Sequence, residues 1–311
     1  MSDINLIIVT GPTASGKTSF AAHLAKRLDS EIISADSRQV YKEMNIGTGK
    51  DYEDYLVDGF LIPSHLIDIR EPGYKYNVYE YQQDFMDTFE KITSRGKLPI
   101  LVGGTGMYIE AVIKGYKLIN VPVNEPLRIE LEKKNLPDLV DQLKKLNANL
   151  HNTTDTKHKK RTIRAIEIAT YYQYHDQLDT YFPKICPLIL GVKFDRGSRR
   201  RIISERLHAR LTSGMIEEVE QLLKKVTPEE LIFYGLEYKF ISQYLTGQLT
   251  KDEMIKKLEI AIHQFAKRQM TWFRKMERGG IKIHWLDGHM TMEEKLNRAQ
   301  VILHKQGIAM K

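Results

Sequence analysis

The chain is poor in cysteine and has no long apolar run. Cys186 is the only cysteine among 311 residues, which excludes an intramolecular disulfide, a cysteine-based zinc finger and a Cys₄ iron–sulfur site. No apolar run approaches the ~20 residues that span a bilayer, and the segment that begins with Met1–Ser2–Asp3 lacks the pattern of a secretory signal. Single-residue tracts and internal repeats are also missing, and 42% of the residues are hydrophobic. We therefore expect a cytoplasmic globular protein without membrane contact.

Charge is unevenly distributed along the chain. Residues 1–150 hold 18 Lys/Arg and 21 Asp/Glu, whereas residues 151–311 hold 29 and 19, and the total is +7. A basic half favours a polyanionic partner, although mild basicity can serve solubility alone. Two dense basic clusters favour phosphate contacts over solvated helix faces: Lys157, Lys159, Lys160, Arg161 and Arg164, then Arg196, Arg199, Arg200, Arg201, Arg206 and Arg210.

Apolar runs predict an α/β fold. Leu6–Val9 is typical of a strand buried on both faces, and a helical pattern follows from Phe20 to Leu28. Further strands are expected at 31–35, 98–102, 187–192 and 281–286. We predict a P-loop NTPase-like parallel sheet core with a small helical insertion and a helix-rich C-terminal half. The expected boundaries are 1–121 for the first part of the core, 122–158 for the helical insertion, and 159–311 for the helix-rich, basic return to the core, expected to bind the polyanionic partner.

A phosphate-binding motif lies between the first strand and the first helix. Residues 11–18 read GPTASGKT and fit G-x-x-x-x-G-K-[ST] at every defined position. Such a loop turns backbone N–H groups inward at a helix N-terminus, where the helix dipole also favours an anion. Lys17 adds a positive charge, and the Thr18 hydroxyl is a candidate Mg²⁺ ligand. The diphosphate-binding or nucleotide-binding residues are predicted to be Gly11, Pro12, Thr13, Ala14, Ser15, Gly16, Lys17 and Thr18.

The acid expected near a phosphate loop follows the second strand. The strand at 98–102 ends in Gly103–Gly104–Thr105, without the aspartate of a Walker ATPase, whereas Asp36 follows the strand at 31–35. Asp36 can accept a proton from a nucleophile, or it can cap the following turn. In open α/β sheets the ligand lies off the carboxyl ends of the strands, so the segments after the first three strands should converge on one crevice.

Six segments occur in a fixed order along the chain: TGPTASGKT (10–18), DSRQVY (36–41), MNIGT (44–48), LIDIR (66–70), LVGGT (101–105) with Tyr108, and AKRQMTWFR (266–274). Together they resemble the tRNA dimethylallyltransferase family, bacterial type, over nearly the whole chain. The resemblance implies transfer of a dimethylallyl group from dimethylallyl diphosphate to N6 of the adenosine 3′ to the anticodon, in tRNAs that read codons beginning with U. The implied partners are the tRNA anticodon stem-loop and the diphosphate, with Mg²⁺ as cofactor and no obligate protein partner.

The same resemblance assigns roles to individual residues. Asp36 becomes the acceptor for the adenine N6 amine, and it forms the catalytic set with Lys17 and Thr105. One departure is Ile202, which stands where the family usually has an arginine, and a second is Tyr234–Tyr238, where the family often has Gly-Tyr. The residues implied to contact tRNA are Asp36, Ser37, Arg38, Gln39, Thr105, Arg128, Lys160, Arg161, Thr162, Ile163 and Arg164.

Two alternatives use the same scaffold differently. A small-molecule kinase would bind ATP at Lys17 and use Asp36 as base for a substrate hydroxyl. A catalytically silent RNA-binding protein would keep the fold without turnover, although the intact Lys17, Thr18, Asp36 and Thr105 argue against it. The helix around 265–276 is expected to be mainly structural, with Phe265, Trp272 and Met276 as its core stripe.

Overall fold

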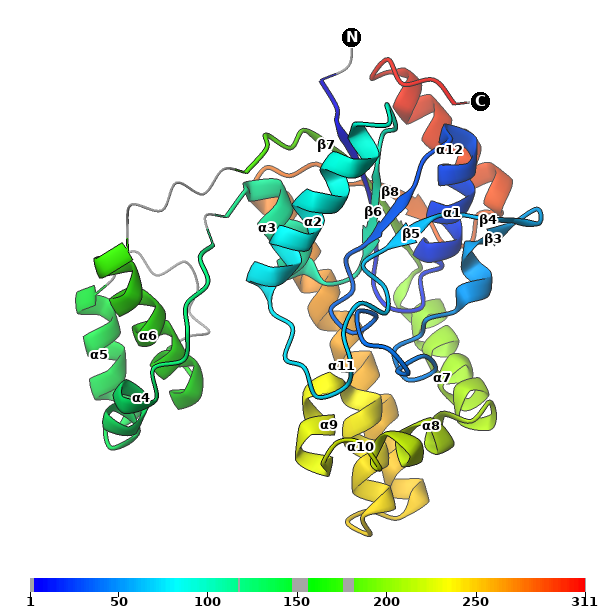
Figure 1. Ribbon diagram of the computed structural model, residues 1–311. Helices are drawn as coiled ribbons and strands as arrows, with labels where there is room; N and C mark the ends of the chain where they lie inside the picture. Colours follow the sequence, from blue (N-terminus) through cyan, green and yellow to red (C-terminus); the bar gives the residue numbers. More distant parts are fainter. Residues whose placement is uncertain (1–2, 117, 147–155, 176–181, 311) are drawn as a thin grey trace. The chain divides into compact units, whose positions relative to one another are not determined.

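The computed structural model describes residues 3–116, 118–146, 156–175 and 182–310 (Figure 1). The chain divides into two compact units, the first formed by Met1–Tyr116 with Pro183–Lys311 and the second by Lys117–Phe182. Among the described residues, no helix is both long and apolar enough to cross a membrane.

A parallel sheet forms the centre of the first unit. Its strands lie in the order β5-β2-β6-β1-β7-β8, and every neighbouring pair is parallel. β1 is buried along its whole length because strands flank it on both sides and helices cover the sheet. A separate antiparallel hairpin of β3 and β4 follows the short 3₁₀ helix η1. The bounds are β1 Leu6–Thr10, β2 Ile32–Ser34, η1 Tyr52–Tyr55, β3 Leu56–Val57, β4 Phe60–Leu61, β5 Ser64–His65, β6 Ile100–Gly103, β7 Pro187–Lys193 and β8 His284–Asp287.

Helices cover the sheet and extend beyond one of its ends (Figure 1). α1 and α12 pack together on one side, α2 and α3 pack together on the other, and α7 to α10 gather with the first turns of α11 at one end. Capping boxes at Asn77, Thr250 and Thr291 fix where α2, α11 and α12 begin. The bounds are α1 Lys17–Leu28, α2 Val78–Thr93, α3 Gly106–Lys114, α7 Arg196–Thr212, α8 Met215–Leu222, α9 Pro228–Tyr234, α10 Leu236–Leu245, α11 Lys251–Arg278 and α12 Met292–His304.

The predicted parallel sheet is confirmed. All five strands expected from the apolar runs are present, with β2 and β8 shorter than the segments 31–35 and 281–286 that suggested them. The two-residue strand β5 was not anticipated, because two residues give no detectable alternation of polar and apolar side chains.

The second unit is a small bundle of α4 (Glu125–Glu132), α5 (Leu136–Leu146) and α6 (Lys159–His175). It has a core of its own, formed by Leu131, Leu139, Leu143, Ile163 and Ile166. The unit extends further than the predicted insertion at 122–158, because α6 packs on α5 and contributes two of these five core residues. We had assigned α6 to the return to the core. Residues 147–155 of the predicted insertion lie outside the described residues.

Candidate active site

The phosphate loop joins β1 to α1 and has the backbone that its sequence demands. Gly16 has φ +74° and caps α1, a left-handed conformation that glycine adopts without strain. A Cβ on Gly11 would lie 2.3 Å from the Val192 carbonyl oxygen, so only glycine fits between the loop and the neighbouring β7. No acidic side chain occupies the first turn of α1, and its N-terminal amides are left to an anion.

This loop forms one wall of a pocket at the carboxyl edge of the sheet. Asp36 and Gln39 from the segment after β2 line it, together with Val102 and Gly103 at the end of β6. The expected convergence of three strand ends is therefore confirmed. The pocket also has lining residues that the sequence did not identify as site residues: Thr48, Gly49, Asp51, Asp54, Tyr55, Arg206 and Arg210.

Lys17 lies in this pocket without a compensating acid in contact. Within the described residues, its ammonium group has no hydrogen bond and no carboxylate within 4.0 Å. Burial lowers the pKa of Lys17, and Asp36 opposes that shift by attraction, whereas Arg206 reinforces it. The side chain is therefore a partly desolvated cation whose charge an incoming anion would balance.

The two oxygens of the Asp36 carboxylate have different surroundings. Its Oδ1 accepts a hydrogen bond from the Arg38 backbone N–H at 2.9 Å, which caps the turn after β2. Its Oδ2 has no hydrogen-bond partner among the described residues, and the side chain lines the pocket. One oxygen therefore fixes the carboxylate while the other is left for a ligand.

Thr105 does not line the pocket, but it is hydrogen-bonded to the segment that carries Asp36. It is the N-cap of α3, and its Oγ1 accepts a hydrogen bond from the Ser37 backbone N–H at 3.1 Å. The same hydroxyl lies 3.4 Å from Ser37 Oγ, and the Thr105 N–H donates to the Ala35 carbonyl. In this structure Thr105 holds the loop that carries Asp36.

Gln269 of α11 is a residue that the sequence did not indicate. Its Oε1 accepts a hydrogen bond from the Thr13 backbone N–H at 2.8 Å, and its Nε2 donates to the Gly104 carbonyl at 3.0 Å. The side chain is buried, and a Cβ on Gly104 would collide with it at 2.5 Å. Gln269 therefore joins the start of the phosphate loop to the segment after β6.

Two arginines of α7 reach the pocket and share one acid. Arg206 and Arg210 place their Nη2 atoms 2.6 Å and 3.2 Å from Asp51 Oδ2. Burial and the neighbouring Arg210 lower the pKa of Arg206. Asp36 and Asp54 also line the pocket, so Lys17, Arg206 and Arg210 bring three cations to a site with three carboxylates. Arg196, Arg199, Arg200 and Arg201 of the same basic cluster do not line the pocket.

Oxygen ligands for a divalent cation are present in the same pocket. Thr18 follows Lys17 at the start of α1, and Asp51 and Asp54 line the facing wall. Burial raises the pKa of Asp54, and the nearby Asp51 adds to the shift. No group of three His, Cys, Asp or Glu side chains suited to a metal occurs in the described part of the chain. A hard cation here would therefore depend on the anion and on water for most of its ligands.

The remaining predicted residues lie in the helical unit, where they have a different environment. Arg128 donates to both oxygens of Glu167, from Nε at 3.1 Å and from Nη2 at 3.0 Å, and Arg164 also pairs with Glu167. Glu167 is only 2% exposed and accepts a further hydrogen bond from the Asn124 N–H. By contrast, Lys160 and Arg161 are exposed, and Thr162 and Ile163 are buried in the bundle.

Comparisons with family models and curated sequences give one consistent result. The model described as "IPP transferase" matches residues 39–276, and the model described as "Isopentenyl transferase" matches residues 4–59. A tRNA dimethylallyltransferase 2 of Bacteroides fragilis is 56% identical over 298 residues, covering 96% of this chain and 97% of the relative. A tRNA dimethylallyltransferase 1 of Parabacteroides distasonis is 56% identical over 307 residues, covering 98% and 100%.

Solved structures resemble the chain over nearly its full length. The full-length tRNA isopentenylpyrophosphate transferase of Bacillus halodurans has a TM-score of 0.71 and 32% identity, and the match covers 97% of this chain and 96% of that one. A eukaryotic dimethylallyltransferase acting on tRNA has a TM-score of 0.79 over 99% of this chain and 81% of its own. At 23% identity, this match shows a shared fold and no more.

Proposed function

The chain belongs to the IPP transferase family, and from this premise we propose that it transfers a dimethylallyl group from dimethylallyl diphosphate to tRNA. The acceptor is N6 of the adenosine 3′ to the anticodon in tRNAs that read codons beginning with U, and diphosphate is released. The observation that carries this proposal is the pocket in which Lys17, without an acid in contact, lies beside Asp36.

Stabilisation of the leaving diphosphate is the task of the phosphate loop. Cleavage of an allylic C–O bond places negative charge on the departing oxygen, so fixed donors around that group lower the barrier. The amides at the N-terminus of α1, the Lys17 ammonium and the guanidinium groups of Arg206 and Arg210 supply this positive environment. Because these groups are already positioned, little reorganisation is needed as the charge develops.

Activation of the acceptor amine is the task of Asp36. The exocyclic amine of adenine is a weak nucleophile because its lone pair is delocalised into the ring. The free Oδ2 of Asp36 accepts its proton as the C–N bond forms and the C–O bond breaks. The amine leaves the helical stack only when the base is flipped out, so the pocket must receive an extruded adenine.

Mg²⁺ fits the donors of the pocket. The Thr18 hydroxyl would hold the ion directly, and Asp51 and Asp54 of the same pocket would offer carboxylates. When bound, the ion neutralises charge on the diphosphate. Lys17 and the two arginines contribute to the same end through hydrogen bonds and charge.

Contact with tRNA is assigned to two sets of residues. Near the pocket these are Asp36, Ser37, Arg38, Gln39 and Thr105, on or beside the segment after β2. In the helical unit, Lys160 and Arg161 offer charges that are open to solvent, whereas Arg128 and Arg164 offer guanidinium groups already oriented by Glu167. Thr162 and Ile163 serve this surface by anchoring α6 in the bundle.

The test is incubation of unmodified tRNA with the protein and dimethylallyl diphosphate, followed by mass spectrometry of the nucleosides. We expect dimethylallyl adenosine at the position 3′ to the anticodon, and no such product from a tRNA with guanosine there. Binding without any product would support the silent RNA-binding alternative. Thermal unfolding addresses the kinase alternative, because ATP with Mg²⁺ would stabilise a kinase, whereas pyrophosphate stabilises the enzyme proposed here.

A further inference from the structure

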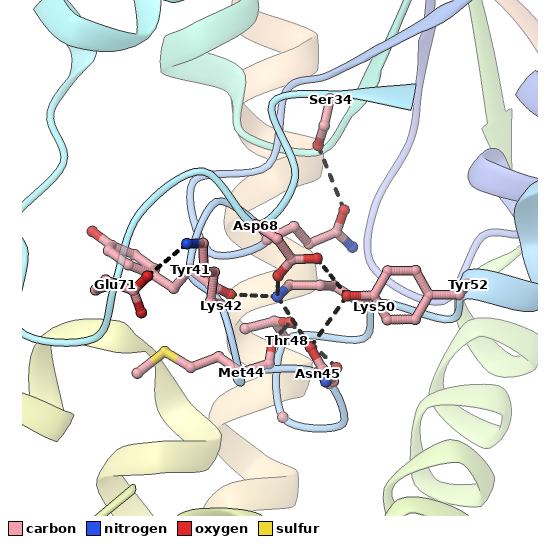
Figure 2. Close-up of polar contacts among 12 residues, drawn as sticks. Ser34, Tyr41, Lys42, Met44, Asn45, Thr48, Lys50, Tyr52, Asp68 and Glu71 are labelled. Atoms are coloured by element: carbon pink, nitrogen blue, oxygen red, sulfur yellow. Dashed lines mark hydrogen bonds and ion pairs between the residues drawn. The ribbon is translucent and has the colours of Figure 1, made fainter. Parts of the chain in front are cut away.

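Two lysines of the segment after β2 form ion pairs in very different surroundings (Figure 2). The Lys42 ammonium lies 2.6 Å from Glu71, and about half of each side chain or more is exposed. The Lys50 ammonium pairs with Asp68, but the Lys50 side chain is only 1% exposed. A buried lysine is costly in free energy unless its charge is balanced and its donors are used, so its presence calls for a specific reason.

All donors of the Lys50 ammonium are directed at the loop around it. It donates to the Tyr41 carbonyl, to Asn45 Oδ1 at 3.2 Å and to Asp68 Oδ1 (Figure 2). Tyr52 donates its hydroxyl to the other oxygen of Asp68. Burial lowers the pKa of Lys50, and the hydrogen bond with Asp68 opposes that shift. Lys50 thereby connects Tyr41 and Asn45, which precede it in the sequence, to Asp68, which follows it.

The loop that Lys50 connects is a wall of the active-site pocket. Asp36, Gln39, Thr48, Gly49 and Asp51 line the pocket, and all five lie within the stretch 36–51. The Gln39 Nε2 donates to the Gly49 carbonyl at 3.1 Å, next to Lys50 itself. No regular helix or strand spans this stretch, so its path depends on such side-chain contacts.

Backbone conformations around Lys50 show that these contacts impose the shape. Glu43, Leu66 and Asp68 all have left-handed backbone, with φ of +60°, +62° and +55°, which residues other than glycine rarely adopt. Backbone hydrogen bonds link the two stretches: Asp68 N–H donates to the Gln39 carbonyl at 3.1 Å, and Ile69 N–H to the Val40 carbonyl at 2.8 Å. The buried Lys50 ammonium joins the same two segments, 39–45 and 66–69, through its hydrogen bonds to Tyr41, Asn45 and Asp68.

We propose that Lys50, paired with Asp68, is a positioning residue for the transfer reaction, which holds the 36–51 loop so that Asp36 faces the acceptor amine. Lys50 acts through Asp36 and touches neither substrate. The inference rests on the proposed function, because it takes Asp36 as the proton acceptor.

The decisive experiment is a double-mutant cycle of Lys50→Met and Asp36→Ala, with kcat measured at saturating substrates. We expect Lys50→Met alone to lower kcat by up to about 10²-fold, as misplacement of a reacting group does. In the Asp36→Ala background it should lower kcat further by no more than about twofold, because the residue it positions is gone. Pyrophosphate affinity does not enter the decision, because Asp51 of the same loop pairs with Arg206 and Arg210, which are assigned to the diphosphate.

Lys42→Met is the matched control, because it removes an exposed lysine and its ion pair from the same loop. Its kcat should stay within about twofold of wild type. Lys50→Arg keeps the charge and should recover part of the lost kcat. If Lys50→Met does not fold, Asp68→Asn enters the same cycle, since it removes the ion pair and keeps an oxygen acceptor.

Each result separates the two proposals. Equal losses from Lys50→Met in both backgrounds would overturn the positioning role and indicate a general loss of structure. If Asp36→Ala alone has no effect on kcat, the proposed role of Asp36 fails, whatever Lys50 does.

Discussion

In the pocket at the sheet edge, Lys17 has no carboxylate in contact among the described residues, whereas in the helical unit Arg128 and Arg164 converge on Glu167. Each region holds predicted site residues, Lys17 and Asp36 in the pocket and Arg128 and Arg164 in the helical unit, whereas the acid Glu167 was not predicted. In the helical unit the protein supplies the counter-charge itself, and the arginines are held in place by it. In the pocket Arg206 and Arg210 pair with Asp51, but Lys17 has no such partner among the described residues, so the proposed diphosphate would supply its counter-charge.

The difference shows what an ion pair does to a cation. A paired guanidinium has most of its attraction satisfied within the fold, so it contributes shape and orientation more than long-range charge. A cation that has lost water and has no ion-pair partner gains the most electrostatic attraction when an anion binds. If that anion carries more charge in the transition state, the cation stabilises the transition state more than the ground state. This contrast agrees with the proposed roles, catalysis for the pocket and tRNA docking for the helical unit.

The largest effect is expected for Asp36→Ala. Loss of the proton acceptor should lower kcat by about 10²–10⁴-fold while the affinity for pyrophosphate is retained, because the phosphate loop is unchanged. Single-turnover transfer to tRNA measures it. Asp87→Ala removes an exposed acid of α2 and serves as control. Turnover within about threefold of wild type would show that Asp36 is not the acceptor.

Lys17→Ala should have the next largest effect, a loss of about 10²–10³-fold in kcat, typical of removing one donor to a developing charge. Pyrophosphate affinity should fall as well, and tRNA affinity should not, because this charge meets the leaving group. The control is Lys26→Ala on the same helix, where the lysine pairs with Asp58 on the surface. If Lys17→Ala lost tRNA affinity and kept pyrophosphate affinity, Lys17 would be a tRNA contact and not a partner of the leaving group.

Glu167→Gln tests the paired region through stability. The amide cannot balance two guanidinium groups, and we expect the free energy of unfolding of the helical unit to fall by about 1–3 kcal/mol. Hydrogen exchange of the amides in α4 and α6 measures it locally. Unchanged protection would mean that the arginine pairs contribute no stability to the helical unit.

The same glutamate gives the wild type a defined pH dependence. Burial alone would raise the pKa of Glu167, but hydrogen bonds from Arg128, the Asn124 amide and Arg164 outweigh it and hold the pKa below its usual 4.5. The stabilisation is therefore present above about pH 4.5 and is lost as the pH falls through the lower pKa of the folded state. Glu167→Gln should remove this acid-dependent loss.

The smallest effect concerns the salt dependence of tRNA binding. Charge reversal at both Lys160 and Arg161 should flatten the plot of log affinity against log salt by about two units at most, since each phosphate contact contributes roughly 0.7–0.9. Arg128→Gln should change that slope by less than about one unit, because Glu167 already balances its charge. Equal slopes for both variants would contradict a difference between free and paired cations.

Local patterns were sufficient to predict the sheet and the first half of the site. The phosphate loop and Asp36 follow buried strands, and parallel strands must end at the same edge, so their meeting follows from the order of the elements. Thr105 was predicted as catalytic from the resemblance, and its hydrogen bond to Ser37 shows how it can act on the Asp36 loop.

The other half of the site comes from segments whose patterns describe only a helix. Arg206 and Arg210 stood in a basic cluster in which no spacing separated the two that reach the pocket from the four that do not. α11 was expected to be mainly structural, and most of its buried side chains are apolar, yet Gln269 lies among them and Phe265 is 40% exposed. Which helix faces meet depends on tertiary packing that periodicity does not encode.

The Gln269 bridge has a consequence for the order in which the active site is completed during synthesis. Thr13 and Gln269 are 256 residues apart. At about 5–20 residues per second, a ribosome needs roughly 13–50 s to add that much chain after the phosphate loop has been made. A slightly longer delay in synthesis separates β1, inside the sheet, from β8 at its edge. A nascent chain thus carries its phosphate loop long before Gln269 has been synthesised. Premature termination anywhere before α11 leaves that loop without the hydrogen bonds that join it to the segment after β6.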